Sequence, residues 1–203
     1  MNANTPGSIV ILLLTVLVSV LGLYKLPQLI KWNLFRPHYV VPKKQYYTVV
    51  SSGFVHASGA HLIFNMLTFY FFGPSLEKVI GTARFVALYL IALVASEART
   101  YFQQRNNPRY ASLGASGAVS AVLFAAIVYF PSQSLFILPI PVPIPAPLFA
   151  VGYLAYSWYL ARRGQDGVNH SAHIDGAVTG LLFVAATDIE AYRRLLAIIS
   201  DRF

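Results

Sequence analysis

The sequence predicts an all-α integral membrane protein, a single domain over residues 1–203 built as a bundle of six transmembrane helices. Three observations predict this fold class. The chain is 57% hydrophobic over its 203 residues. Only 11% of its residues are charged, against about a quarter in an average soluble domain. Its apolar residues form six runs, and a soluble fold of this size could not bury that much apolar surface.

Each apolar run approaches the length of a membrane span. The hydrocarbon core of a bilayer is about 30 Å thick, so a helix needs about 20 apolar residues to cross it. The first run has no basic stretch before it and no clear cleavage site after it, which predicts a retained helix rather than a removed signal peptide. We place the spans at approximately 7–24, 58–76, 82–98, 113–130, 146–162 and 171–187.

The connections between these runs differ in length and composition. Residues 25–57 form the longest loop, and residues 77–81 are predicted to be a tight turn because Gly73–Pro74 marks a helix end. Within 131–145 prolines alternate with apolar residues, and proline cannot donate to a helix, so an extended connector is expected there. Residues 163–170 are predicted to be a short polar link.

The tail after the core of about 51–187 has its own pattern. In residues 188–203, Ile189, Tyr192, Leu196 and Ile199 share one helical face. This pattern is typical of an amphipathic helix at the membrane interface, and ordinary packing against the bundle explains it equally well.

The net charge is +8, and it does not indicate nucleic-acid binding. The basic residues lie in short gaps between apolar runs without interleaved aromatic residues, as charges flanking a membrane do. Most of them lie in the loops after the first, third and fifth spans, and the positive-inside rule would place those loops in the cytoplasm. The absence of cysteine excludes disulfides, zinc–thiolate sites and a cysteine nucleophile.

Polar residues inside spans are costly and point to function. His61 and Asn65 are four residues apart, so they share one helix face, and His56 lies just before them. The pair could donate two side-chain hydrogen bonds to one point. Asparagine is a poor zinc ligand and no carboxylate joins the group, so a metal site is disfavoured. Hydrogen bonding between helices remains an alternative.

A second polar group opens the fourth span. Ser116 lies between Gly114–Ala115 and Gly117, which leaves its hydroxyl and backbone N–H accessible. It also lies near a helix N-terminus, where free N–H groups favour a nearby anion. Small residues alone would indicate only close helix packing.

A third group opens the sixth span. His173, Gly176 and Gly180 fall on one helical face, and the glycines permit close packing at the same seam. Asp175 should not orient His173, because residues two apart point in nearly opposite directions on a helix. His170 is expected to be a solvated loop histidine.

Together the three groups contain the parts of a serine hydrolase. A serine hydroxyl becomes a good nucleophile when a base takes its proton, and an imidazole can do so near neutral pH. The tetrahedral oxyanion that follows needs preformed donors. Ser116 is the candidate nucleophile, His173 the candidate base, and the Ser116 N–H, His61 and Asn65 the candidate oxyanion donors.

These motifs resemble those of the rhomboid intramembrane proteases. That family has a His, His, Asn pattern on its second core helix, Gly-x-Ser-Gly on the fourth and Ala-His-x-x-Gly-x-x-x-Gly on the sixth. The corresponding residues here are His56, His61 and Asn65, then Gly114, Ser116 and Gly117, then Ala172, His173, Gly176 and Gly180. The resemblance covers about 51–187.

The resemblance implies a serine endopeptidase with a Ser116–His173 dyad and an acyl-enzyme intermediate. It implies transmembrane protein segments as substrates within the lipid bilayer, with no cofactor, no metal and no nucleic acid. The fifth helix and fifth loop would act as gate and cap. Six spans is the bacterial-type core, so we expect a bacterial cell membrane. The family's usual topology puts the active-site side outside, against the distribution of basic residues, and we follow the family topology because the motif match is the more specific signal. The sequence does not set the oligomeric state.

Two positions depart from the family pattern. Some members have a tyrosine four residues after the serine, stacked on the catalytic imidazole, and here that position is Ser120. An aromatic residue from another span is therefore expected to orient His173. The first loop lacks the family's Trp-Arg pair, and Tyr46–Tyr47 stands near its usual place.

Two other functions fit the composition. An inactive rhomboid-like protein that binds membrane partners would typically have lost the serine or the histidine, and this chain has both. A small transporter or channel could use the histidines as a proton relay, but the sequence shows no duplicated halves.

Overall fold

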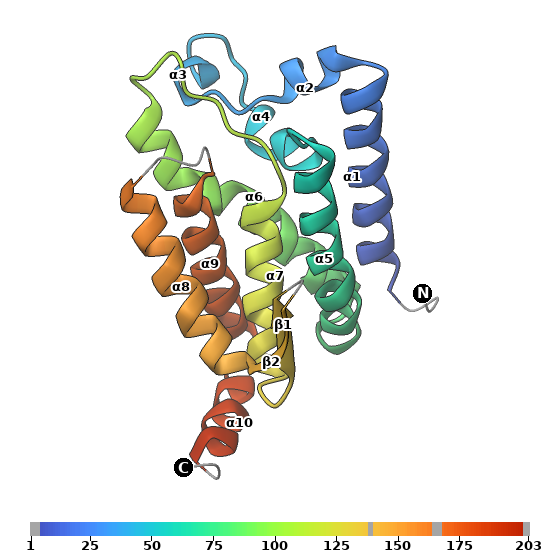
Figure 1. The fold of residues 1–203 in the computed structure, drawn as a ribbon, viewed down its shortest axis with the longest axis vertical. Coiled ribbons are helices and arrows are strands. Elements are labelled where there is room, and N and C mark those ends of the chain that lie inside the picture. Colours follow the sequence, from blue (N-terminus) through green and yellow to red (C-terminus); the bar gives the residue numbers. More distant parts are fainter. Residues whose placement is uncertain (1–4, 138–139, 164–167, 201–203) are drawn as a thin grey trace.

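The computed structural model describes residues 5–137, 140–163 and 168–200, which form an all-α bundle with one small hairpin (Figure 1). The elements, in chain order, are α1 (Pro6–Tyr24), α2 (Pro27–Asn33), α3 (Pro37–Val40), α4 (Thr48–Ser51), the 3-10 turn η1 (Ser52–Phe54), α5 (Gly59–Ile80), α6 (Thr82–Gln104), α7 (Ser116–Tyr129), β1 (Ser134–Ile137), β2 (Ile140–Pro145), α8 (Ala146–Arg163), α9 (His170–Thr187) and α10 (Ile189–Ser200).

Helix α7 forms the centre of the bundle. Every residue from Gly117 to Val128 is buried, because α5, α6 and α9 pack around it. The helix is apolar on all sides and rich in alanine and valine, as expected for a helix enclosed by others. Ser116, its first residue, therefore lies at the N-terminal end of the most enclosed element of the fold.

The predicted spans correspond to α1, α5, α6, α7, α8 and α9 to within a few residues at most ends. By length and composition, two helices in the described part of the chain can each cross a bilayer alone, α1 and α6. Helices α9 and α10 meet the same criterion only as a pair, and they are bent by 108°. The all-α membrane fold is thus supported, and six crossings remain a prediction.

The predicted turn at 77–81 is wrong. Helix α5 continues through Pro74 to Ile80 and ends at Gly81, whose φ is +80°. The last turn is held by Glu77, a buried carboxylate that accepts hydrogen bonds from the backbone N–H groups of Gly7 and Ser8 at 2.9 and 2.7 Å. These bonds fix the end of α5 to the free N–H groups at the start of α1, and they outweigh the one donor that proline removes.

The proline-rich connector is extended, as predicted, but it folds back on itself. Strands β1 and β2 pair antiparallel, with Leu135 opposite Ile144 and Ser134 opposite Pro145. Alternate proline positions suit a two-stranded ribbon, because every second N–H of an edge strand faces away from its partner. The 25–57 region also contains short helices, and of the predicted link, residues 164–167 lie outside the described part of the chain.

Helix α10 uses its apolar face in two ways. The Tyr192 hydroxyl donates to the Leu181 carbonyl at 2.8 Å, and Ala191 is buried. Ile189 and Leu196 are 53% and 64% exposed. One part of the helix therefore packs on the bundle, while another presents apolar side chains outward.

Candidate active site

Helices α7 and α9 lie in direct backbone contact. A Cβ at Gly176 would collide with the Gly117 carbonyl group, and one at Gly180 with the Ala121 carbonyl group. From the first contact to the second, the position moves four residues toward the C-terminus on each helix. The two helices therefore run parallel, with their N-termini at the same end. Ser116 immediately precedes Gly117, and His173 is one turn before Gly176, so both lie at that end of the contact.

The backbone before Ser116 adopts a conformation that requires glycine. Gly114 has φ of +117°, which L side chains rarely adopt, and its N–H donates to the Ser52 carbonyl at 2.9 Å. A Cβ there would lie 2.6 Å from Cε1 of His61. Gly114 thus lets the chain turn sharply into α7 with the His61 ring against it.

His61 and Asn65 lie in the first two turns of α5. Ser58 caps this helix by accepting from the His61 N–H at 3.2 Å. The Asn65 side-chain amide donates to the His61 carbonyl at 3.2 Å, which uses one of its two N–H groups. Both side chains face the same cavity as Ser116 and His173.

His56 is fully buried and supports the backbone just before Ser116. Its Nε2 accepts from the Ala115 N–H at 3.5 Å, so its proton must be on Nδ1, which lies 2.9 Å from the Ser19 hydroxyl. The Ser19 hydroxyl in turn donates a hydrogen bond to the Phe54 carbonyl. Burial, and secondly the nearby His61, lowers the pKa of His56 to about 3. His56 therefore acts as a neutral link between α1 and the residue before Ser116.

An aromatic residue from another helix lies on His173, as the sequence led us to expect. The ring of Tyr153, on α8, stacks on the His173 ring with centroids 6.3 Å apart and planes at 22°. The Tyr153 hydroxyl is 2.8 Å from that of Ser120. Sequence reasoning identified the need for this residue but not its position, because no spacing rule relates α8 to α9.

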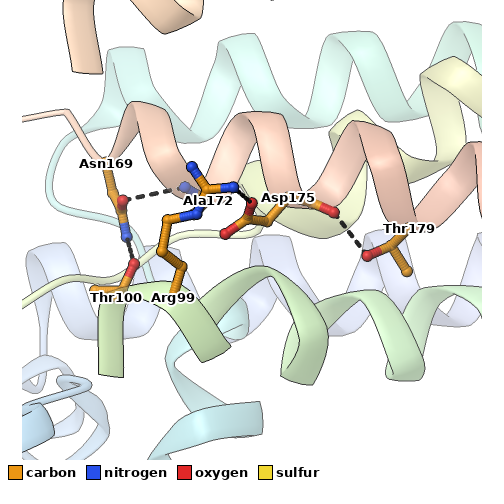
Figure 2. A network of polar contacts seen from close by, with 6 residues as sticks. All are labelled: Arg99, Thr100, Asn169, Ala172, Asp175 and Thr179. Carbon is orange, nitrogen blue, oxygen red and sulfur yellow. Dashed lines mark hydrogen bonds and ion pairs between the residues drawn. The ribbon is translucent and has the colours of Figure 1, made fainter. Parts of the chain in front are cut away.

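A polar network fixes the start of α9 (Figure 2). Asn169 caps the helix by accepting from the Ala172 N–H at 3.1 Å, and its amide donates to Thr100 at 2.9 Å and to Glu97 at 3.3 Å, both on α6. Asp175 forms an ion pair with Arg99 of α6 at 2.6 Å. Asp175 is thus turned toward α6, in agreement with the prediction that it does not orient His173.

The prediction for His170 is wrong. It is the first residue of α9 and is only 7% exposed, with its ring edge-on to that of His173 at 5.5 Å. His170 begins the helix that Asn169 caps, and its side chain lies in the cavity lining beside His173.

All four principal candidates line one cavity of about 1550 Å³: Ser116, His173, His61 and Asn65. Its walls come from α5, α6, α7, α8 and α9, with the β1 strand at one end. Tyr153 and Glu97 also line it. Within the described residues, no three histidine or acidic side chains come together as a metal site would require. The cavity can hold an extended peptide segment beside a hydroxyl, an imidazole and several N–H donors.

The fold and the site define a helical membrane protein with a largely apolar cavity between its helices, into which a few polar side chains are gathered. The chain belongs to the rhomboid family, since the model of the rhomboid domain matches residues 43–188. It is 30% identical to Rhomboid protein 1, mitochondrial, of Saccharomyces cerevisiae over 95% of this chain and 58% of that protein.

Two further relatives are also mitochondrial rhomboid-type proteins that this chain matches over part of their length. The chain is 33% identical to the presenilin-associated rhomboid-like protein, mitochondrial, of Rattus norvegicus, over 66% of this chain and 36% of that protein. It is 28% identical to a mitochondrial RHOMBOID-like protein of Arabidopsis thaliana, over 67% of this chain and 45% of that protein. The chain thus spans about half the length of these relatives. Their names correct the expectation of a bacterial membrane, because they point to a mitochondrial one.

Proposed function

We propose that this protein is an intramembrane serine endopeptidase that cleaves transmembrane segments of other proteins in a mitochondrial membrane. The observation that carries the proposal is the parallel contact of α7 and α9 at Gly117 and Gly176, which brings Ser116 and His173 to the same end of that contact, where both line one cavity. The family membership supports the same activity.

The reaction would begin with Ser116. His173 takes the hydroxyl proton as Oγ attacks the peptide carbonyl, and the new tetrahedral oxyanion accepts hydrogen bonds from the Ser116 N–H, His61 and Asn65. His173 then gives the proton to the leaving amine, which breaks the peptide bond and leaves an acyl-enzyme. A water molecule, deprotonated by His173, hydrolyses the ester and releases the serine.

The cavity suits a substrate that arrives from the bilayer. Its wall includes apolar side chains of α5 and α8, among them Phe64, Phe71 and Phe149. Helix α8 has few buried residues, Ala146 and Ser157 among those described. Weakly packed elements are the ones that open locally, so α8 would serve as the gate.

The test is cleavage of a model transmembrane substrate by protein purified into proteoliposomes. Ser116→Ala and His173→Ala should each abolish cleavage, and Ser116→Ala should also abolish labelling by a serine-directed fluorophosphonate. Ser132→Ala, in the exposed loop after α7, and His38→Ala, in α3, are the matched controls and should remain active. Cleavage that survives Ser116→Ala would reject the proposal. A folded wild type that neither cleaves nor labels would favour a non-enzymatic rhomboid-like binding protein.

A further inference from the structure

Tyr153 connects three helices at the candidate site. It lies on α8, its ring stacks on His173 of α9, and its hydroxyl bonds to Ser120 of α7. Its ring also packs on Phe124 of α7, with centroids 5.5 Å apart, and on Phe149 of α8 at 5.8 Å. The position of this one side chain is therefore fixed from several sides.

The contacts of Tyr153 bear on both members of the proposed dyad. Ser120 is four residues after Ser116, one turn along the same face of α7, so the hydroxyl bond ties Tyr153 to the helix that carries the nucleophile. The stacked ring restricts rotation of the His173 imidazole. Asp175 cannot do this, because it is paired with Arg99 on α6.

We propose that Tyr153 is the positioning residue for His173, and that Ser120 holds Tyr153 in place, so that the orientation of the imidazole depends on α8 being docked. Helix α8 presents Leu148, Val151 and Tyr156 outward, each more than 60% exposed. Movement of α8 away from the bundle takes the Tyr153 ring off His173. The dyad is then assembled only when α8 closes.

The kinetic consequence rests on the proposed function. An aromatic ring that orients the base acts on turnover rather than on substrate binding, so Tyr153→Leu should lower kcat by about 100-fold and leave KM within about twofold. Tyr153→Phe keeps the stack and loses the hydroxyl with its hydrogen bonds to Ser120 and Ser157, so kcat should fall by about three- to tenfold.

A double-mutant cycle separates the hydrogen bond from general packing. Ser120→Ala removes the bond to Ser120 without a substitution in α8, and it should lower kcat by no more than Tyr153→Phe does. The double variant should be no slower than Tyr153→Phe, because both already lack the Ser120–Tyr153 bond. Tyr156→Leu, on the exposed face of α8, is the matched control and should retain wild-type kcat and KM.

A second measurement does not depend on proteolysis. In protein labelled at histidine, the Cε1–H resonance of His173, assigned by its loss in His173→Ala, should feel the ring current of Tyr153. It should shift in Tyr153→Leu and stay in place in Tyr156→Leu. If the wild type proves inactive but this shift occurs, the positioning contact holds while the proposed function fails.

Three results would overturn the proposal. One is a folded Tyr153→Leu variant with the kcat of Tyr156→Leu. Another is a rise in KM at unchanged kcat, which would make Tyr153 a substrate-binding residue. The third is a His173 resonance that does not respond to loss of the Tyr153 ring.

Discussion

Replacement of Gly176 by alanine is the most direct test of the helix contact on which the site depends. The added Cβ would collide with the Gly117 carbonyl group, lying 2.7 Å from its carbon and 3.0 Å from the Gly117 Cα. Ordinary carbon–carbon contacts are about 3.5 to 4.0 Å, so α7 and α9 must separate by about 1 Å. Neither side can yield by rotating a side chain, because the atoms struck belong to the backbone.

The expected cost can be worked out from this displacement. Overpacking costs about 1–3 kcal/mol, while alanine in place of glycine within a helix returns up to about 1 kcal/mol. The free energy of unfolding should therefore fall by about 1–2 kcal/mol. A displacement of about 1 Å between reacting groups can lower kcat/KM by about 100-fold, which corresponds to about 2.7 kcal/mol.

Two glycine variants serve as controls for the same assays, cleavage of a transmembrane model substrate and thermal unfolding. Gly180→Ala meets the Ala121 carbonyl carbon at 2.9 Å, one turn farther from Ser116, so it should lose similar stability but less activity. Gly152→Ala, on α8, meets nothing within 4 Å and should lose neither. The reasoning fails if Gly176→Ala keeps wild-type kcat/KM, or if Gly180→Ala is the less active of the two.

Three further predictions concern stability, each measured as the free energy of unfolding in mixed micelles. The unfolded chain binds a proton at His56 near pH 6.5, whereas the folded chain binds one only near pH 3, so folding becomes less favourable as the pH falls below 6.5. The free energy of unfolding of the wild type should therefore fall by about 1.4 kcal/mol per pH unit more than that of His56→Gln. Equal slopes for the two proteins would contradict this. Asn169→Ala should cost about 2 kcal/mol, since it removes the α9 cap and a donor to the partly buried Glu97. Asn169→Asp places a second carboxylate beside Glu97 and should not restore the lost stability. Glu77→Gln should lower the free energy of unfolding by about 2–3 kcal/mol, because an amide N–H₂ would face the Ser8 N–H. The control Glu190→Gln, at an exposed residue, should change it by less than about 0.5 kcal/mol.

Sequence patterns located the helices well and their ends less well. Apolar runs set the spans because hydrophobic length is a local property of the chain. The end of α5 was misplaced because the group that holds it, Glu77, is bonded to residues about 70 positions away. The burial of His170 was missed for a similar reason, since the cap by Asn169 depends on where α6 lies.

The candidate site shows the same division. Ser116, His173, His61 and Asn65 were found from short motifs, and the structure brings all four to one cavity, while their catalytic roles remain predictions. His56 was noted from the same motif, but its link to Ser19 and the Ala115 N–H needed the fold. Glu97 was missed although it lies in the predicted span 82–98, where a charged residue is itself a signal of function; no spacing motif includes it.

The sequence by itself determined that this chain is a helical membrane protein, and it indicated which residues are proposed to carry the chemistry, because hydrophobic length and motif spacing are local properties of one segment at a time. Only the tertiary structure decided that α7 and α9 run parallel in backbone contact, that Asp175 turns to Arg99, and that Tyr153 of α8 lies on His173. These are contacts between segments far apart in the chain, and they depend on how the helices pack around one another.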